Sequence, residues 1–455
     1  MSATTDTELT KTLAAVVTRN KAFFKKSIGG MMESLDLKQF AAIELPRFVR
    51  VKQHFEKKRV GDIAEEIKTR LAPHLSHLQG KKIAIGIGSR GIANLREIAR
   101  SLVDELVAAG AEPFIIPTMG SHGGATASGQ AEVLASYGIT PESMGVPIEA
   151  SMEVASIGEL EPGVPIYVAK SALQADGIVV IARIKPHTAF RGPIESGVAK
   201  MLTIGLGKQI GADFIHHQGF RRFAELIPRM AQAVVERTSV LFALGIVENA
   251  YEQTYRIEAF SREEILAMEK EAALLEESKS IMGQIPFPEF DLLVIEEIGK
   301  DVSGDGQDPN VTGLYITKCC SGGPLFQKCV IFDLTHETHG NANGMGGADI
   351  ITRNLFDKID FISTYTNAFT STEFLPVKIP MVAGGKEDAL RIALKTCNRA
   401  APGKQKVVWI KNTCALEEIV ISEALLEEAQ AHPQIDILTQ AGDVAFPQGE
   451  PVFPW

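Results

Sequence analysis

The stretch KKIAIGIG at residues 81–88 is followed by NLREIARSLVDELVAAG at 94–110 and EPFIIPTMG at 112–120. The first and third stretches are short apolar runs typical of buried strands, and the second has the apolar spacing of an amphipathic helix. A strand, a helix and a strand in this order predict parallel strands with a helix packed over them. We therefore expect an α/β fold.

The same alternation continues along the chain and is interrupted once. The segment SREEILAMEKEAALLEESKS has a helical apolar stripe and begins with a capping-box pattern at Ser261 and Glu264. The Pro-containing IMGQIPFPEF follows, and the strand and helix patterns then resume. We predict an N-terminal α/β domain at 1–258, a connecting helix and linker at 259–283, and a C-terminal α/β domain at 284–455. A ligand cleft is expected between these two α/β domains.

The composition is that of a globular protein with an acidic balance. Of the 455 residues, 45% are hydrophobic, and 46 basic against 56 acidic residues give a formal net charge of −10. This charge argues against nucleic acid or a membrane as the partner, but it leaves open a small anionic ligand in a local basic pocket. The first twenty residues have no long apolar run, and no window approaches the roughly 18 apolar residues of a membrane span. We expect a cytoplasmic protein.

The five cysteines are odd in number and lack CxxC spacing. We expect reduced thiols rather than a disulfide or zinc framework. The adjacent Cys319 and Cys320 leave two interpretations open, a redox role and a packing role, and we favour packing.

Two Gly-rich loops, at 86–94 and 117–130, each leave a predicted strand and enter a predicted helix. Backbone N–H groups at such a helix start can bind a phosphate or carboxylate, although glycine is also ordinary in tight turns. The second loop carries His122, followed by Gly123 and Gly124. An imidazole among glycines has little to pack against and is able to exchange protons with a ligand.

His187 follows the apolar run GIVVIARIKP, at the carboxyl end of a predicted strand. His122 has the same position relative to its own strand, so the two rings would act on a ligand from different strand ends as acid and base. Arg183, Lys185 and Arg191 concentrate positive charge around His187 in a chain that is acidic overall. This reversal indicates an anionic ligand, unless the three side chains are solvated surface cations.

Lys200 and His216 lie in a segment interrupted by Gly205, Gly207 and Gly211. On one continuous helix the two side chains would lie on nearly opposite faces. A break near Gly207 would fold His216 back toward Lys200. One histidine and one lysine do not form a metal site, so any metal here needs further ligands from another source.

The second predicted domain has two candidate segments of its own. IGKDVSGDGQDPNVTG, at 298–313, is rich in Asp and Gly but lacks the ligand order and closing Glu of a calcium loop. Lys300, with Glu297 just before the segment, is the better candidate for contacting a substrate across the cleft. His336 and His339 have HxxH spacing, which could ligate a metal, but we favour a cleft-lining or structural role because a turn follows them.

The chain resembles the nickel-dependent lactate racemase family, including homologues that act on other 2-hydroxy acids, in an ordered set of polar residues: Arg90, His122, His187, Lys200 and His216. The resemblance covers most of the chain. The motifs that carry it are GSRG, GSHGGAT, KPHTAFRGPIESGVAKM, IGLGKQIGA and IGKDVSGDGQDPNVTG.

The resemblance implies a cofactor, the nickel-pincer nucleotide, in which a pyridinium mononucleotide holds nickel through one carbon and two sulfurs. Lys200 would carry it covalently as a thioamide, and His216 would supply the fourth nickel ligand. Sulfur ligands and one imidazole suit a four-coordinate, square-planar Ni(II). The groups that would hold the nucleotide phosphate are Gly123, Gly124, Arg183 and Lys185.

The resemblance also implies the reaction, the inversion of a 2-hydroxy acid. His122 and His187 would act as acid and base, while Arg90 and Lys300, with Glu297 beside Lys300, would contact the substrate. Removing a hydride instead of a proton from the chiral carbon gives a flat 2-keto acid and avoids a dianion beside the carboxylate. Return of the hydride to the other face inverts the carbon.

Two departures from the lactate enzymes bear on the substrate. TAFRGPIESGVA, at 188–199, is longer than the corresponding segment, and GSHGG lacks the basic residue that usually follows this histidine. Both lactate and a larger or more polar 2-hydroxy acid, such as a sugar acid, stay open. The predicted protein is thus a racemase or epimerase whose partners are this substrate and the proteins that build its cofactor. The alternatives are a metal-assisted hydrolase using His336 and His339, and a nucleotide or sugar-acid binding protein without turnover.

Overall fold

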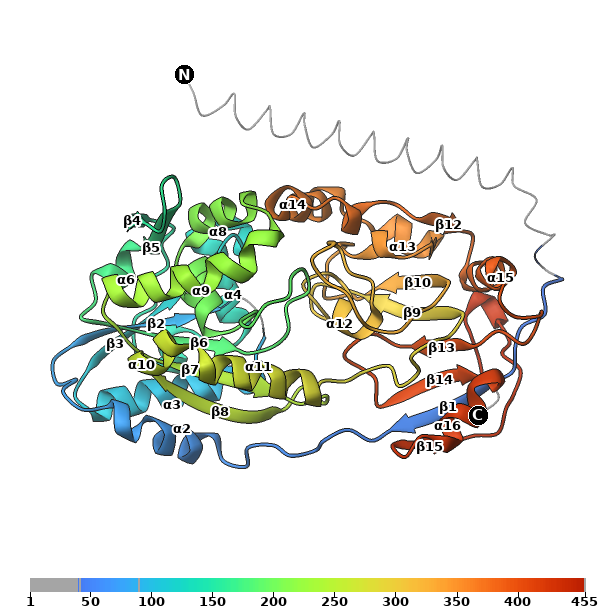
Figure 1. The fold of residues 1–455 in the computed structure, drawn as a ribbon, viewed down its shortest axis with the longest axis horizontal. Helices are drawn as coiled ribbons and strands as arrows, with labels where there is room; N and C mark the ends of the chain where they lie inside the picture. The colour runs from blue at the N-terminus through green and yellow to red at the C-terminus, as the bar shows by residue number, and fades with distance from the viewer. Residues whose placement is uncertain (1–39, 41, 89–90, 454–455) are drawn as a thin grey trace, which may run out of the picture.

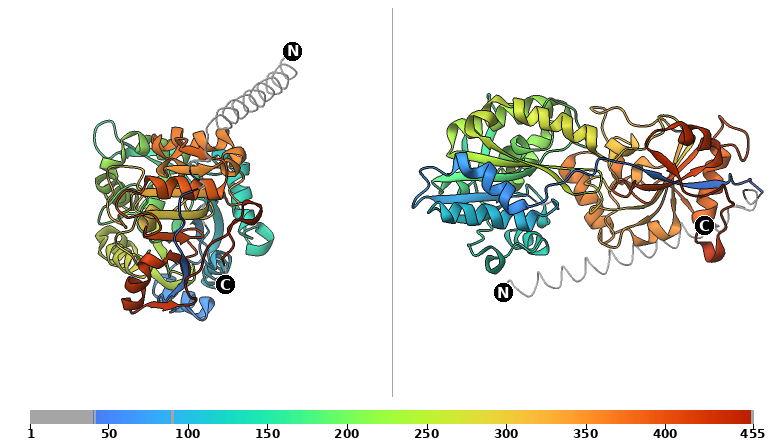
Figure 2. Two further views of the ribbon diagram at one scale, coloured as in Figure 1. Left: turned by 90° about the vertical axis from the view of Figure 1, so that its right-hand side faces the viewer. Right: turned by 90° about the horizontal axis from the view of Figure 1, so that it is seen from below.

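Two α/β units make up the protein and lie side by side along its long axis (Figure 1). This computed structural model describes residue 40 and residues 42–88 and 91–453. The view from below in Figure 2 shows the same arrangement. Strands and helices alternate, and parallel strands form the centre of both main sheets, so the predicted fold class is confirmed.

The first unit contains a five-stranded sheet in the order β3-β2-β6-β7-β8. The strands are β2 (Lys82–Ile87), β3 (Glu112–Pro117), β6 (Gly177–Arg183), β7 (Val240–Glu248) and β8 (Thr254–Ser261). The first four are parallel, and β8 pairs antiparallel with β7 at the edge. Along β2, Ile83 and Ile85 pack on one face and Ala84 on the other, all fully buried. Burial on both faces explains why these strands are unbroken apolar runs in the sequence.

Helices cover both faces of this sheet. One face packs against α2 (Ile63–Leu71) and α3 (Leu95–Ala108), and the other against α9 (Phe220–Arg237). The other elements of the unit include the β4 and β5 hairpin (Val154–Glu159 and Pro165–Ala169), α4 (Ala127–Ser136), α5 (Pro141–Met144), α6 (Lys170–Leu173), α7 (Val198–Lys200) and α8 (Lys208–His217).

The predicted connecting helix is in fact two helices, α10 (Arg262–Ala267) and α11 (Glu269–Ile281). The predicted capping box is confirmed: the Ser261 hydroxyl accepts the Glu264 N–H at 3.2 Å, and the Glu264 carboxylate accepts the Ser261 N–H at 2.8 Å. Met268, at a φ of 64°, separates the two helices. Because α11 buries Leu274 and Leu275 in the core of the first unit, it belongs to that unit rather than to a free linker.

The second unit contains an eight-stranded sheet in the order β12-β11-β10-β9-β13-β14-β1-β15. Its strands are β9 (Leu292–Ile298), β10 (Lys328–Leu334), β11 (Ile350–Thr352), β12 (Met381–Ala383), β13 (Val407–Ile410), β14 (Glu418–Ser422), β1 (Phe48–Gln53) and β15 (Ile435–Ile437). The strands from β12 to β13 in this order are parallel, and the pairings beyond β13 are antiparallel. The helices of the unit include α12 (Pro309–Thr312), α13 (Arg353–Lys358), α14 (Phe361–Ser371), α15 (Lys386–Thr396) and α16 (Leu426–Ala431).

The position of β1 differs from the predicted division of the chain. The predicted N-terminal domain, 1–258, includes this strand, but β1 pairs with β14 and β15 in the second sheet. Val49 and Val51 lie in the core of the second unit. The chain then runs along the molecule to α2 in the first unit (Figure 1). A strand whose partners lie hundreds of residues away leaves no local signal of the sheet that it joins.

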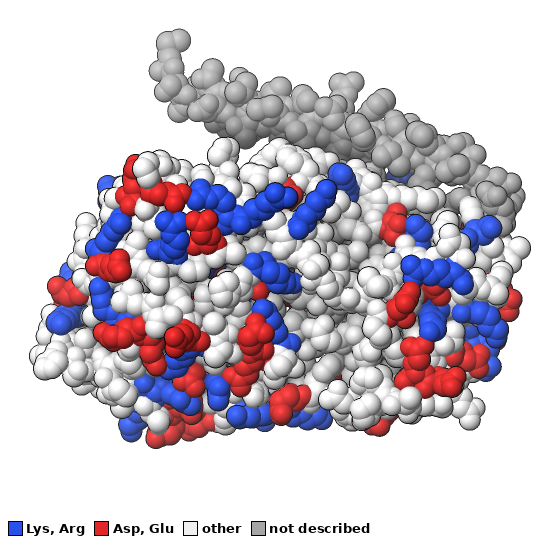
Figure 3. All heavy atoms as spheres, viewed as in Figure 1, with Lys and Arg blue, Asp and Glu red and all other residues white. Residues whose placement is uncertain are grey.

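The surface carries charges of both signs. On the face in Figure 3, acidic and basic side chains are interspersed over both units. Among the helices of the described residues, none is both long enough and apolar enough to cross a bilayer.

All five cysteine thiols are free, as the sequence predicts. Burial raises the pKa of Cys397 to about 12 and that of Cys320 to about 11. Thiols with such pKa values are protonated at neutral pH and react slowly, which favours the packing role.

Candidate active site

A cavity of about 530 Å³ between the two units collects polar residues from both of them. Among the predicted site residues that line it are His122, His187, Lys200, His216 and Lys300. Gly123 and Gly124 line it as well. Adjoining cavities share Lys200, His122 or Lys300 with it, so these residues stand at the centre of the space between the units.

The carboxyl ends of the strands bring several of these residues together. His122 lies in the loop after β3, His187 in the loop after β6, and Lys300 in the loop after β9. Parallel strands end at the same edge of a sheet, so residues far apart in the sequence meet there. The strand-end loops of the two sheets approach each other across this cavity.

Lys200 and His216 meet because the segment between them is not one α-helix. Residues Met201–Gly205 form a π-helical turn directly after Lys200, a rare feature that frequently occurs at functional sites. The predicted break follows at Lys208, whose φ is 53°, and α8 then carries His216 to the cavity. Gly207 is required before the break, because a Cβ there would lie 2.6 Å from the Thr203 carbonyl oxygen.

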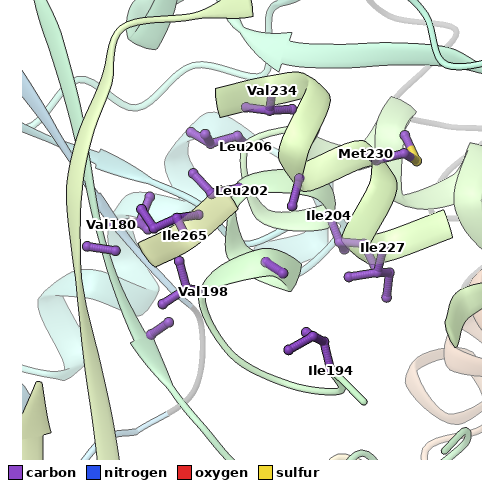
Figure 4. Close-up of a cluster of buried hydrophobic side chains, with 14 of the residues drawn as sticks. Val180, Ile194, Val198, Leu202, Ile204, Leu206, Ile227, Met230, Val234 and Ile265 are labelled. Carbon is purple, nitrogen blue, oxygen red and sulfur yellow. The ribbon is translucent and has the colours of Figure 1, made fainter. Parts of the chain in front are cut away.

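A packed apolar base holds the segment that carries Lys200. Figure 4 shows Val198, Leu202 and Leu206 from this segment packed among side chains of β6, α9 and α10. All three are fully buried. The backbone of Lys200 is therefore fixed by core packing on both sides of it in sequence, while its side chain reaches the cavity.

Glu271 holds the start of the same segment. This α11 residue is 2% exposed, and both of its carboxylate oxygens accept the Ala199 N–H at 3.2 Å. A Cβ on Gly197 would lie 2.2 Å from a Glu271 oxygen, so only glycine allows this approach. Burial raises the pKa of Glu271 to about 7, against the opposing effect of the backbone N–H groups.

The protein is expected to lose stability relative to its Glu271→Gln variant as the pH rises from 4.5 to 7. The folded-state pKa lies above the unfolded value, so the folded protein binds the extra proton and this contribution is lost through that window. The difference in the free energy of unfolding should change by about 3 kcal/mol and then level off above pH 7. Urea unfolding of both proteins at several pH values measures it. Parallel pH profiles would contradict the prediction.

One hydrogen bond fixes the tautomer of His216. Its Nδ1 donates to the Ala212 carbonyl at 2.7 Å, because a carbonyl only accepts, and this leaves the lone pair on Nε2. Burial lowers the pKa of His216, and the nearby Lys200 charge lowers it further. The rings of Phe220 and Phe223 flank it at centroid distances of 5.7 and 5.2 Å. A neutral imidazole with a fixed tautomer is the state that binds a metal.

His187 is held from several directions. The Glu195 carboxylate, which is fully buried, accepts the His187 N–H at 2.6 Å, and the ring lies 4.6 Å from the Phe190 ring. Its Nδ1 accepts the Ala189 N–H at 3.0 Å. A neutral His187 in this orientation therefore carries its proton on Nε2 and is able to donate it.

Carboxylates partly neutralise the cations near His187. Arg183 pairs with the buried Glu248 at 2.8 Å, and Lys185 pairs with the buried Asp308 of the second unit at 3.1 Å. Arg183 and Lys185 still line the adjoining cavities of about 480 and 150 Å³. Because each is paired with a buried carboxylate and also lines a cavity, they are not solvated surface cations, and the anionic ligand stays a prediction.

The end of the loop at 298–313 and the residues just after it contact the first unit. Arg191 donates to the Asn310 side chain at 2.5 Å and to the Tyr315 hydroxyl at 2.8 Å. The Thr317 hydroxyl donates to the Ala189 carbonyl at 2.5 Å. These contacts fix the His187 loop against the second unit.

The remaining predicted residues have different surroundings. Glu297 accepts from the Asn412 amide at 3.0 Å and, among the described residues, is not part of the cavity lining. Arg90 lies outside the described residues. His339 lines an adjoining cavity, and its ring centroid lies 6.0 Å from that of His336. In the described part of the chain, no three His, Cys, Asp or Glu side chains cluster as potential metal ligands.

Sequence reasoning missed several residues that position the site, among them Glu271, Glu195 and Lys208. The ammonium of Lys208 is fully buried and donates to the Pro117 carbonyl, tying the start of α8 to the end of β3. Burial lowers its pKa to about 8. The sequence did contain a signal for Lys208, because it is a lysine in a largely apolar and glycine-rich run. That signal does not indicate which residue Lys208 contacts.

The fold and the cavity define an α/β protein of two units with a polar cavity at their interface. A family model described as "Domain of unknown function (DUF362)" matches residues 88–258, which include most of the first unit. A search of curated proteins found no match. Among solved structures, the lactate racemase apoprotein from Thermoanaerobacterium thermosaccharolyticum is similar, with a TM-score of 0.49 and 15% identity. That similarity covers 81% of this chain and 99% of the other.

Proposed function

We propose that this protein is a racemase or epimerase of a 2-hydroxy acid that works with a nickel-pincer nucleotide. One observation carries the proposal: His122, His187, Lys200, His216 and Lys300 line a single cavity. An amine able to form a thioamide, an imidazole able to ligate nickel, and two further imidazoles able to move protons are thereby within one space.

The residues present fit the proposed cofactor. His216 offers a neutral Nε2, and the protein side chains around it form no metal site of their own among the described residues, so the cofactor would supply the other ligands. Lys200 also lines a neighbouring cavity of about 150 Å³. Gly124 leaves open backbone at the cavity, because an added Cβ would meet no atom of the described residues within 4 Å. When bound, the cofactor supplies a reversible hydride acceptor.

The phosphate of the nucleotide is proposed to lie against Gly123 and Gly124, with Arg183 and Lys185 nearby. Gly123 has a φ of 64° and cannot take a side chain, because a Cβ would lie 2.7 Å from the backbone of Gly129. The backbone at the start of α4 is thus closely approached by this loop. Arg183 and Lys185 would share their charge between the phosphate and their carboxylate partners.

The chain's own groups would handle the substrate and its proton. His122 and His187 take up and return the hydroxyl proton, one acting when the substrate presents one face and the other when it presents the opposite face. Lys300, whose Nζ donates to the Gly304 carbonyl at 2.6 Å, has further donors for the substrate carboxylate. Arg90 is proposed as a second carboxylate contact, and Glu297 as a weaker one. The apolar Phe220 and Ile316 limit water in the cavity.

A single-enantiomer 2-hydroxy acid incubated in deuterium oxide with the loaded protein is expected to invert while keeping its α-hydrogen. Nuclear magnetic resonance measures deuterium at that carbon, and chiral chromatography measures inversion. Inversion with deuterium at the α-carbon would contradict the hydride route. The protein should come from a host that contains the proteins that build the cofactor.

Intact mass separates this proposal from the two alternatives. A metal-assisted hydrolase at His336 and His339, or a binding protein without turnover, needs no addition on Lys200. The proposed enzyme carries one and releases nickel on digestion. His336 and His339 have no third potential ligand clustered with them in the described residues, so we favour the racemase.

A further inference from the structure

One wall of the cavity is an uncharged polar face of a single helix. Five residues of α14 line it at the spacing of one helical face: Ser363, Thr366, Asn367, Thr370 and Ser371. Asn341 and Asn343, from the loop after β10, continue the same wall. In Figure 1, α14 lies beside α8, the helix that carries His216. The wall therefore belongs to the space in which the substrate of the proposed function would lie.

This wall has largely used its hydrogen-bond donors within the protein. The Thr366 hydroxyl donates to the Ile362 carbonyl at 2.8 Å, and the Thr370 hydroxyl donates to the Thr366 carbonyl at 3.1 Å. Asn367 donates to the Ser363 carbonyl at 2.7 Å. Their side-chain oxygens keep lone pairs that are able to accept. The wall thus offers mainly acceptors to a ligand.

Asp305 adds a stronger acceptor to the same cavity. It is 8% exposed, and its Oδ2 is buried without a hydrogen-bond partner among the described residues. Among the residues that the structure describes, its other oxygen has one long contact, 3.5 Å, with the Asn343 amide. A buried carboxylate oxygen that lacks a donor is costly, and a ligand hydroxyl would satisfy it once the Asp305 side chain turns toward the cavity that it lines.

Charge is distributed unevenly around the cavity. The α14 sequence FISTYTNAFTS contains no charged residue, whereas Lys200 and Lys300 are at other positions in the lining. A carboxylate or phosphate only accepts hydrogen bonds, so it is poorly matched to a wall of acceptors next to Asp305. A chain of hydroxyl groups donates, and it is well matched.

We infer that the substrate is a polyhydroxylated 2-hydroxy acid, a sugar acid, whose hydroxyl tail binds Asp305 and the polar face of α14. The inference rests on the proposed function for the position of the carboxylate, near Lys300. The ribose of the nucleotide is a second possible source of the same hydroxyl chemistry. The test therefore separates the substrate from the cofactor.

Calorimetry on the full-length protein, loaded and cofactor-free, should compare gluconate with 2-hydroxyhexanoate, which has the same number of carbons but lacks the extra hydroxyls. The loaded protein is expected to bind gluconate at least about tenfold more tightly than 2-hydroxyhexanoate, since each added hydrogen bond contributes a severalfold gain in affinity. Thr366→Val and Asp305→Asn should each weaken gluconate binding by about tenfold and leave 2-hydroxyhexanoate unchanged.

Thr396→Val is the matched control. Thr396 lies on α15, outside this cavity lining, and its hydroxyl donates to the Ile392 carbonyl at 3.0 Å, as that of Thr366 does to Ile362. The control should bind both acids as the unmodified protein does. Thermal unfolding of all variants shows whether each is folded.

Three results would overturn the inference. Equal affinity for the two acids would show that the protein does not recognise the hydroxyl tail. Unchanged gluconate binding in both variants would show that Thr366 and Asp305 do not contact the hydroxyl tail. A loss of the mass addition at Lys200 in these variants, with gluconate binding intact, would assign the wall to the ribose of the cofactor. Expected binding without any inversion would instead leave the inference in place and count against the proposed racemase.

Discussion

The Lys200→Arg variant is expected to have the mass of the bare polypeptide, to release no nickel and to show no turnover above background. Arginine keeps the positive charge beside His216 but cannot form the thioamide that the proposed cofactor requires. The unmodified protein from the same host should carry the mass addition. Intact-protein mass spectrometry, nickel analysis after digestion and a chiral assay measure the three results.

The structure makes this a specific test of the side chain. The backbone at Lys200 is fixed by Val198 and Leu202 in the core and by Glu271 at the start of α7, so a change of side chain leaves the helix anchored. Lys170→Arg is the matched control. Lys170 is a solvent-exposed lysine of the same unit, paired with Glu153 at 3.1 Å. A mass addition that persists in Lys200→Arg, or maps to Lys208, would contradict the proposal.

The His122→Gln and His187→Gln variants are each expected to lower kcat by about 10²- to 10⁴-fold, the usual range for loss of an acid or base. Glutamine keeps a polar side chain of similar size but cannot exchange a proton. The mass addition at Lys200 should be unchanged, because neither histidine is the tether. Inversion should fall in both directions, since each direction needs one imidazole as base and the other as acid.

His217→Gln is the control for this pair. His217 is an exposed imidazole beside His216 on α8 and does not line the described cavity. It should retain full turnover. If either His122→Gln or His187→Gln keeps more than about a tenth of the turnover, that histidine is not the proton-transfer group.

The elements that the sequence predicts well are those whose own residues specify them. The apolar run at 81–88 contains β2, and the run GIVVIARIKP contains β6, because both faces of these strands are buried. The capping box of α10 formed because both of its partners lie within one turn. The break at Met268 was not predicted, since a methionine at positive φ has no sequence signature.

The candidate site divides in the same way. His122 and His187 are identified by their place after apolar runs, and the strand ends bring them to one cavity. Glu271 and Asp305 have no such signal, because each is defined by its contacts or burial. Glu271 contacts a backbone N–H far away in the sequence. The Oδ2 of Asp305 becomes buried, with no donor among the described residues, only once the chain has folded around it.

By itself, the sequence determined the alternation of strands and helices, the α/β class and the set of polar residues at the ends of apolar runs. These features depend on the periodicity of apolar residues and on the spacing of residues close together in the chain. The tertiary structure alone decided that β1 joins the second sheet, that Lys185 meets Asp308 across the units, and that a neutral face of α14 closes the cavity. The physical reason is that such pairings depend on long-range packing and on which charges become buried together. No short stretch of the sequence contains information on either the long-range packing or the pairing of buried charges.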